Sequence, residues 1–184
     1  PVLSAVVFLA VKDMIDLRAL RHLRRVNKIE YATALVSLAG VLVFGILEGL
    51  LLAAIFSVVM LLRWAANPHT AVLGRIPGTD RFGDVERHPH NETFPGVLIF
   101  RCEGGIFYFN VDSVKEQLLA RVARHDGTLR LVIFDLSSSP QVDLAGVRIL
   151  GDLHDRLAER GIALELVEAH QQVRELLRRA DDMD

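Results

Sequence analysis

Hydrophobic positions follow one another almost without interruption in the first third of the chain and alternate with charged positions in the rest. Residues 31–62 contain one charged residue, Glu48. A single helix over these residues would be about 48 Å long, well beyond the roughly 30 Å hydrocarbon core of a membrane. Two glycines and the carboxylate at residues 45–49 favour a turn there. The pattern therefore predicts two short membrane-spanning helices, at residues 30–44 and 50–63.

Basic residues flank the predicted helix pair on one side only. Six Lys or Arg residues lie between residues 12 and 28, and Arg63 follows the second helix, whereas the predicted turn has none. The positive-inside rule places both ends of the pair in the cytoplasm, together with the water-soluble part that follows. Leucines at three-residue spacing among arginines over residues 13–27 predict a helix lying in the membrane interface. Residues 1–11 are expected to end an earlier span of a longer, multi-pass protein.

After residue 96 the pattern changes to alternating strands and helices. The run LRLVIFDL is almost continuously apolar, which is typical of a central strand. Ser113 and Glu116 have the spacing of a capping box and predict the start of a helix. Such alternation predicts a mixed, largely parallel sheet with helical crossovers. The predicted strands are residues 97–101, 106–109, 129–136 and 162–167, with the two later helices at residues 144–160 and 171–180.

The expected fold class is a membrane α-helical segment followed by a soluble α/β domain with a mixed β-sheet and helices packed on it. The predicted domains are residues 1–66 for the membrane helices and 97–184 for the soluble domain. Residues 67–96, rich in Gly, Pro, Asp and His, are expected to form an irregular linker. A final strand or helix is expected beyond residue 184.

Composition narrows the possible chemistry. The formal net charge of −2 gives no basic field for nucleic acid. Cys102 is the only cysteine, which favours a reducing compartment and a buried, apolar role for its side chain. His88 and His90 lack carboxylate or cysteine partners at metal-ligand spacing. We therefore expect no catalytic residue, no metal site, no cofactor and no enzymatic activity.

One loop has the physical character of a site. It precedes the predicted helix at residues 144–160, where free backbone amides and the positive helix end could hold an anionic group or contact a partner protein. The alternative is that Asp143 simply caps the helix while the serines form a turn. Both interpretations stay open on the sequence alone. The candidate residues are Ser137, Ser138, Ser139, Asp143 and Gly146.

Three stretches carry a family resemblance. The stretch HTAVLGRIPGTDRFGDVERHPHNETFPGVLIFRCEGGIFYFN resembles the join between transporter and soluble domain in the sulfate permease (SulP) family of anion transporters. The stretches DLSSSPQVDLAGVRIL and RGIALELV resemble the core of its STAS domain, a fold shared with bacterial anti-sigma-factor antagonists. In those antagonists an Asp-Ser-Ser-Gly phrase carries a phosphorylated serine. The matching residues here are Asp143, Leu144, Ala145 and Gly146, so this chain has no hydroxyl for such a switch.

The resemblance implies the C-terminal portion of a secondary active anion transporter of the sulfate, bicarbonate, chloride or dicarboxylate class. Residues 1–66 would supply gate-domain helices, and the STAS domain would support assembly and regulation in the cytoplasm. The substrate anion would bind in an upstream core domain, so no substrate-binding residue is expected here. The implied setting is a cell membrane, with the lipid bilayer, a second copy in a homodimer and a cytosolic protein as partners. The alternative is a membrane-anchored STAS signalling module that binds a protein or nucleotide without transport.

Overall fold

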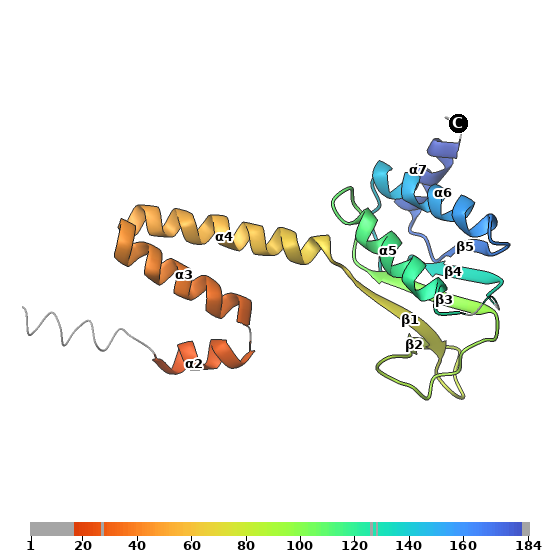
Figure 1. Ribbon diagram of the computed structural model, residues 1–184, viewed down its shortest axis with the longest axis horizontal. Helices are drawn as coiled ribbons and strands as arrows, with labels where there is room; N and C mark the ends of the chain where they lie inside the picture. The colour runs from red at the N-terminus through yellow and green to blue at the C-terminus, as the bar shows by residue number, and fades with distance from the viewer. Residues whose placement is uncertain (1–16, 27, 126, 128, 182–184) are drawn as a thin grey trace, which may run out of the picture. The chain divides into compact units, whose positions relative to one another are not determined.

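The computed structural model of the chain describes residues 17–26, 28–125, 127 and 129–181. Contacts divide the chain into two compact units, Pro1–Arg63 and Trp64–Asp184. The described part of the first unit is helical, and the second unit combines a sheet with helices (Figure 1). The predicted segment at residues 1–11 lies outside the described residues.

Three helices are described from the start of the chain to the sheet: α2 (Leu17–Val26), α3 (Lys28–Phe44) and α4 (Ile46–Ala66). Helix α2 falls within the helix predicted at residues 13–27, of which residues 13–16 and 27 lie outside the described residues. Its described arginines are exposed. The last three residues of α4 belong to the second unit.

The turn between α3 and α4 is shorter than predicted. Gly45 alone separates the two helices, with a φ of +105°, a backbone conformation that favours glycine. The predicted turn at residues 45–49 is right at Gly45 and wrong at residues 46–49, since Glu48 lies in the first turn of α4. Gly49 instead allows the helices to approach closely, because a Cβ there would lie 2.3 Å from the backbone nitrogen of Val41.

Among the described helices, α4 is the one that is long and apolar enough to cross a membrane. It has 21 residues and a mean hydropathy of 2.2. At 1.5 Å per residue this is about 32 Å, which matches a hydrocarbon core of about 30 Å. Helix α3 has 17 residues, about 26 Å by the same rise, and is therefore shorter than that core.

The second unit contains one five-stranded mixed sheet in the order β2-β1-β3-β4-β5. Strand β1 pairs antiparallel with both β2 and β3, whereas β3, β4 and β5 run parallel to one another. This agrees with the expected mixed, largely parallel sheet. The strands are β1 (His69–Arg75), β2 (Phe82–Asp84), β3 (Val97–Glu103), β4 (Leu131–Asp135) and β5 (Ala163–Val167).

Three local predictions for this unit are wrong. Residues 67–96 are not an irregular linker, because they contain β1 and β2, and β1 is hydrogen-bonded along β3. Residues 106–109 are not a strand, since Ile106 makes only an isolated bridge with Val142. The capping box is absent as well: Ser113 and Glu116 lie inside α5 (Val111–Val122), whose N-cap is Asn110.

The core lies between one face of the sheet and three helices, α5, α6 (Leu144–Ala158) and α7 (Gln171–Asp181) (Figure 1). Phe100 and Phe134 pack edge to face with ring centroids 5.1 Å apart, and both are fully buried. The helices contribute buried aliphatic side chains such as Leu118, Leu153 and Leu157. A smaller cluster on the other face of the sheet contains Ala71, Leu73 and Ile99.

Candidate functional site

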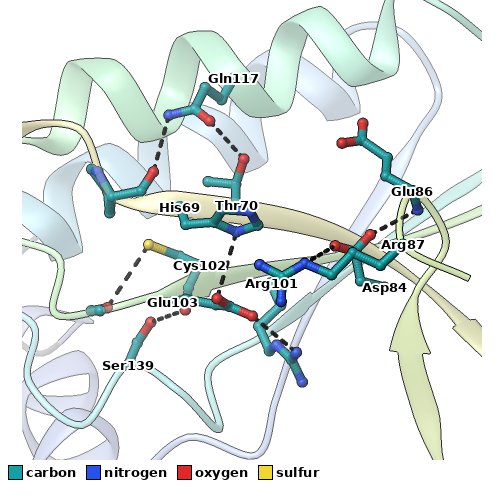
Figure 2. A network of polar contacts seen from close by, with 12 residues as sticks. His69, Thr70, Asp84, Glu86, Arg87, Arg101, Cys102, Glu103, Gln117 and Ser139 are labelled. Atoms are coloured by element: carbon teal, nitrogen blue, oxygen red, sulfur yellow. Dashed lines mark hydrogen bonds and ion pairs between the residues drawn. The ribbon is translucent and has the colours of Figure 1, made fainter. Parts of the chain in front are cut away.

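The predicted site loop, residues 137–143, connects β4 to α6. Within it Ser139 is fully buried, and its Oγ donates a hydrogen bond to the backbone oxygen of Cys102 at 3.1 Å (Figure 2). The backbone N–H of Ser139 donates to the oxygen of Leu136 at 3.0 Å. A buried hydroxyl with a satisfied hydrogen bond is part of the packing, so Ser139 fixes the loop to β3 rather than presenting a reactive group.

The two preceding serines differ from Ser139 in exposure. Ser137 is exposed and Ser138 is half-buried. The backbone N–H of Ser137 donates to Asp135 Oδ1 at 2.9 Å, and its carbonyl oxygen accepts a hydrogen bond from His170 Nε2 at 3.0 Å. Of the three predicted serines, Ser137 is therefore the one with an exposed side chain that a partner could contact. Its backbone is fixed by hydrogen bonds to Asp135 and His170.

Asp143 caps α6, as the capping interpretation predicts. Its Oδ1 accepts a hydrogen bond from the N–H of Gly146 at 2.8 Å, and its Oδ2 accepts one from the N–H of Tyr108, also at 2.8 Å. Gly146 cannot be larger, because a Cβ there would lie 2.6 Å from Val142 Cγ1. The carboxylate of Asp143 thus occupies the helix N-terminus, which the other interpretation assigned to an external anionic group.

The segment at residues 104–110, where a strand was predicted at 106–109, packs beside this loop as an irregular turn. Ile106 exchanges two backbone hydrogen bonds with the loop, one donated to Gln141 and one accepted from Asp143, each 3.0 Å long. Asn110 is 3% exposed, and its Oδ1 accepts a hydrogen bond from the N–H of Phe107 at 2.8 Å. An asparagine just before an apolar helical pattern is a common cap signal and could have revealed this turn.

A second polar network ties the start of β1 to α5 and β3 (Figure 2). Thr70 Oγ1 donates to Gln117 Oε1 at 2.6 Å, and Gln117 Nε2 donates to the oxygen of Pro68 at 3.4 Å. On β3, Glu103 lies 3.5 Å from His69 Nδ1 and 3.2 Å from Arg101 Nη2. The residues at which the chain enters the sheet are therefore fixed by side chains of three different elements.

The described residues offer no evident catalytic chemistry. Cys102 is fully buried, and burial raises the pKa of its thiol to about 11, so the thiol stays protonated at neutral pH. No group of three or more His, Cys, Asp or Glu side chains that could hold a metal ion occurs within the described part of the chain. A polar hollow beside the site loop is lined by Pro140, Gln141, His170, Gln171, Gln172 and Glu175.

Comparison with known families gives the fold a name. Residues 88–181 match the family model described as the STAS domain. The chain belongs to the STAS domain family. The match covers β3 to β5 and α5 to α7, and the structure adds β1 and β2 to the same sheet.

Curated relatives align with both the helices and the STAS domain. A probable sulfate transporter of Mycobacterium tuberculosis is 32% identical over 182 residues, covering 99% of this chain and 32% of the relative. Low affinity sulfate transporter 3 of Stylosanthes hamata is 31% identical over 193 residues, covering 100% of this chain and 30% of the relative. The chain spans about a third of the length of these relatives. Both are named as transporters rather than enzymes, in agreement with the prediction of no catalysis.

Solved structures support the fold assignment. The structure of SLC26A9 has a TM-score of 0.77 at 19% identity, over 90% of this chain and 28% of that chain. The murine Solute Carrier 26 family member A9 anion transporter in the inward-facing state has a TM-score of 0.77 at 20% identity, over 86% of this chain and 26% of that chain. At this level of identity the likeness shows the fold alone. The expected fold class, apolar helices followed by an α/β STAS domain, is confirmed.

Proposed function

We propose that the chain is the C-terminal portion of a secondary active anion transporter, with α3 and α4 as gate-domain helices and a cytoplasmic STAS domain. The observation that carries this proposal is the extent of the alignment. Sulfate transporters from a bacterium and a plant match 99% and 100% of the chain, so the likeness includes the apolar helices as well as the STAS domain.

Charge and exposure support the membrane orientation. Large side chains of α3 and α4 such as Leu42, Ile46 and Leu50 are more than 60% exposed, as expected for a surface in contact with lipid. Arginines are concentrated in α2, before the helix pair, whereas Gly45 between the helices is flanked by no basic residue. The positive-inside rule then places α2 and the STAS domain on the cytoplasmic side of a cell membrane.

The substrate we propose is sulfate or a related small anion, because both relatives are named as sulfate transporters. Its binding residues belong to the part of those relatives that this chain does not match. The STAS domain serves assembly, with a homodimer as the proposed state, and regulation through a cytosolic protein. The proposed contact surface for that protein is the exposed side of the loop at residues 137–143, with Ser137 and the polar hollow beside it.

The test is a replacement experiment in the plant transporter, since it aligns with all of this chain. The part of it that this chain matches, 30% of its length, is exchanged for residues 1–184, and uptake of radiolabelled sulfate is measured in proteoliposomes. The expected result is retained uptake that falls when residues 64–184 are deleted, with sulfate binding preserved. The control is the same replacement in the plant transporter, made with the part of the M. tuberculosis relative that matches this chain. If that control transports sulfate while the folded, inserted exchange with this chain does not, the proposal is wrong and the membrane-anchored signalling module is favoured.

A further inference from the structure

Three consecutive aromatic residues stand on the surface of the STAS domain. They are Phe107, Tyr108 and Phe109, here called the aromatic segment. Tyr108 is 74% exposed and Phe109 is 37% exposed. Their rings contact one another, with centroids 5.5 Å apart for Phe107 and Phe109 and 5.3 Å apart for Tyr108 and Phe109. Phe107 is half-buried, so the three rings form one partly exposed apolar patch, which makes this segment a candidate binding surface.

The aromatic segment is held in this exposed position by the domain. The N–H of Phe107 donates to Asn110 Oδ1, and the N–H of Tyr108 donates to Asp143 Oδ2, each at 2.8 Å. Asn110 is buried and Asp143 is fixed as the cap of α6. The backbone is therefore pre-organised, and the rings are presented at little cost in conformational entropy.

The aromatic segment also lies beside the residues at which the chain leaves α4. Asn110 Nδ2 donates a hydrogen bond to the oxygen of Ala65 at 3.1 Å, and Ala65 is the penultimate residue of α4. Trp64 is 73% exposed and lines the same hollow of the second unit as Phe107 and Phe109. Four aromatic side chains therefore gather where the longest apolar helix ends.

We infer that the aromatic segment, together with Trp64, inserts into the interfacial layer of the lipid bilayer and anchors the STAS domain to the membrane surface. This inference rests on the proposed membrane placement of α4. Trp and Tyr side chains favour the headgroup level, where the ring meets the acyl chains and the polar atom stays hydrated. The end of α4 defines that level, and the hydrogen bond from Asn110 to Ala65 brings the aromatic segment to it.

Charge favours lipid over a free anion as the ligand. Residues 104–113, GGIFYFNVDS, contain no Lys or Arg and one carboxylate, Asp112, so they offer no cation to bind a phosphate or sulfate group. The rings are therefore expected to insert at the boundary between the headgroups and the acyl chains of a bilayer. Because the segment has no basic residue, this insertion should not require anionic lipid.

Tryptophan fluorescence tests the inference, because Trp64 is the only tryptophan of the chain. The whole chain is placed in phosphatidylcholine vesicles containing lipid brominated close to the headgroup end of the acyl chains, which quenches only tryptophan in contact with lipid. Three single-tryptophan proteins are compared: the unchanged chain, and Tyr108→Trp and Phe82→Trp, each combined with Trp64→Phe. Phe82 is the matched control, since it is 44% exposed and lies in the edge strand β2.

The expected result is a loss of emission and a blue shift at positions 64 and 108 and neither change at position 82. Quenching at position 64 with a response at 108 equal to that at 82 overturns the inference while leaving the membrane placement of α4 intact. Absence of quenching at both 64 and 108 overturns the inference together with that placement. Protection of position 108 from aqueous acrylamide without bromine quenching overturns it in favour of a protein partner. Phe109→Trp reads the same surface if Tyr108→Trp fails to fold.

Discussion

The helical unit and the STAS domain use the same apolar residue types in opposite ways. In α3 and α4, Leu42 and Ile46 are each 78% exposed, whereas in the STAS domain Leu98 is 1% exposed and Phe134 is fully buried. The mean hydropathy of +0.32 for the whole chain describes neither part. An apolar side chain gains nothing from burial if its surroundings are already hydrocarbon. The difference agrees with the proposed placement of the apolar helices in lipid and of the STAS domain in water.

This contrast has a consequence for hydrogen bonding as well. A helix satisfies its backbone groups internally, which is why apolar helices need few side-chain hydrogen bonds in lipid. The STAS domain uses buried polar side chains such as Ser139 and Asn110 to hold loops in place. Substitutions should therefore act through packing and polar contacts in the STAS domain and through transfer into lipid in the helices.

The largest expected effect is on the core of the STAS domain. Phe134→Ala should lower its free energy of unfolding by about 3–5 kcal/mol, because a fully buried ring is replaced by a cavity. Phe44→Ala, at a side chain that is 62% exposed in α3, should leave that free energy unchanged. The measurement is labelling of the buried Cys102 thiol as a function of urea, which reports opening of this domain alone. Equal effects of the two substitutions would contradict the two-solvent comparison.

A charge placed in α4 tests the other half of the comparison. Ile55→Asp should disfavour membrane insertion by about 3 kcal/mol, since an aspartate near the centre of a spanning helix must leave water. The control is Leu144→Asp, at a side chain that is 43% exposed in the first turn of α6, where a carboxylate is tolerated. The fraction of chain resistant to alkaline extraction from membranes checks the prediction. Full resistance of Ile55→Asp would argue that α4 does not span.

Much of the fold could be predicted because periodicity and turn residues act locally. The apolar run at residues 129–136 became β4, an interior strand between β3 and β5, and Asp143 and Gly161 mark the ends of α6 as expected. The hairpin of apolar helices was also predicted, although its turn was predicted to be longer than the single residue Gly45. In each of these cases the residues that decide the structure lie within a few positions of the element.

The errors come from elements that distant residues create. Strand β1 exists because it pairs with β3 about thirty residues later, and its proline- and glycine-rich surroundings hid the pattern. Asn110 is the N-cap of α5, but its side chain bonds to Phe107, Gly105 and Ala65 rather than to an N–H of the helix, and these partners could not be predicted from the local sequence. For the candidate site, the sequence indicated the loop at residues 137–143 but could not show that segment 104–110 packs on it.

A smaller loss of stability is expected from substitution at the contact between the loop at residues 137–143 and the segment at residues 104–110. Asp143→Ala removes two hydrogen-bond acceptor oxygens, one capping α6 and one bonded to the N–H of Tyr108, and should destabilise the STAS domain by about 2 kcal/mol. Asp143→Asn keeps one acceptor oxygen and should lose less. Urea-dependent labelling of Cys102 measures both variants. An alanine variant no less stable than the asparagine variant would show that the hydrogen bond kept by the asparagine oxygen carries no stability.

The smallest effect concerns a partly exposed charge cluster between α5 and α6. Asp152 on α6 accepts hydrogen bonds from Lys115 Nζ on α5 and from Arg156 Nε, at 2.9 Å for the latter, and these two cations, Lys115 first, hold the pKa of Asp152 below its ordinary value. A lowered pKa in the folded state stabilises the protein above the unfolded pKa of about 4, and this contribution is lost as the pH falls through the folded pKa.

The substitution Asp152→Asn should accordingly lower the melting temperature of the STAS domain slightly at pH 7. The difference from the unchanged chain should shrink below about pH 4, where the carboxylate begins to be protonated. Raising the salt concentration should reduce the difference at pH 7, because the cluster is partly exposed to solvent and its charges are screened to that extent. A difference that is independent of both pH and salt would assign the effect to packing between α5 and α6. It would also remove the evidence that this helix surface is exposed to water rather than covered by lipid or by a second protein.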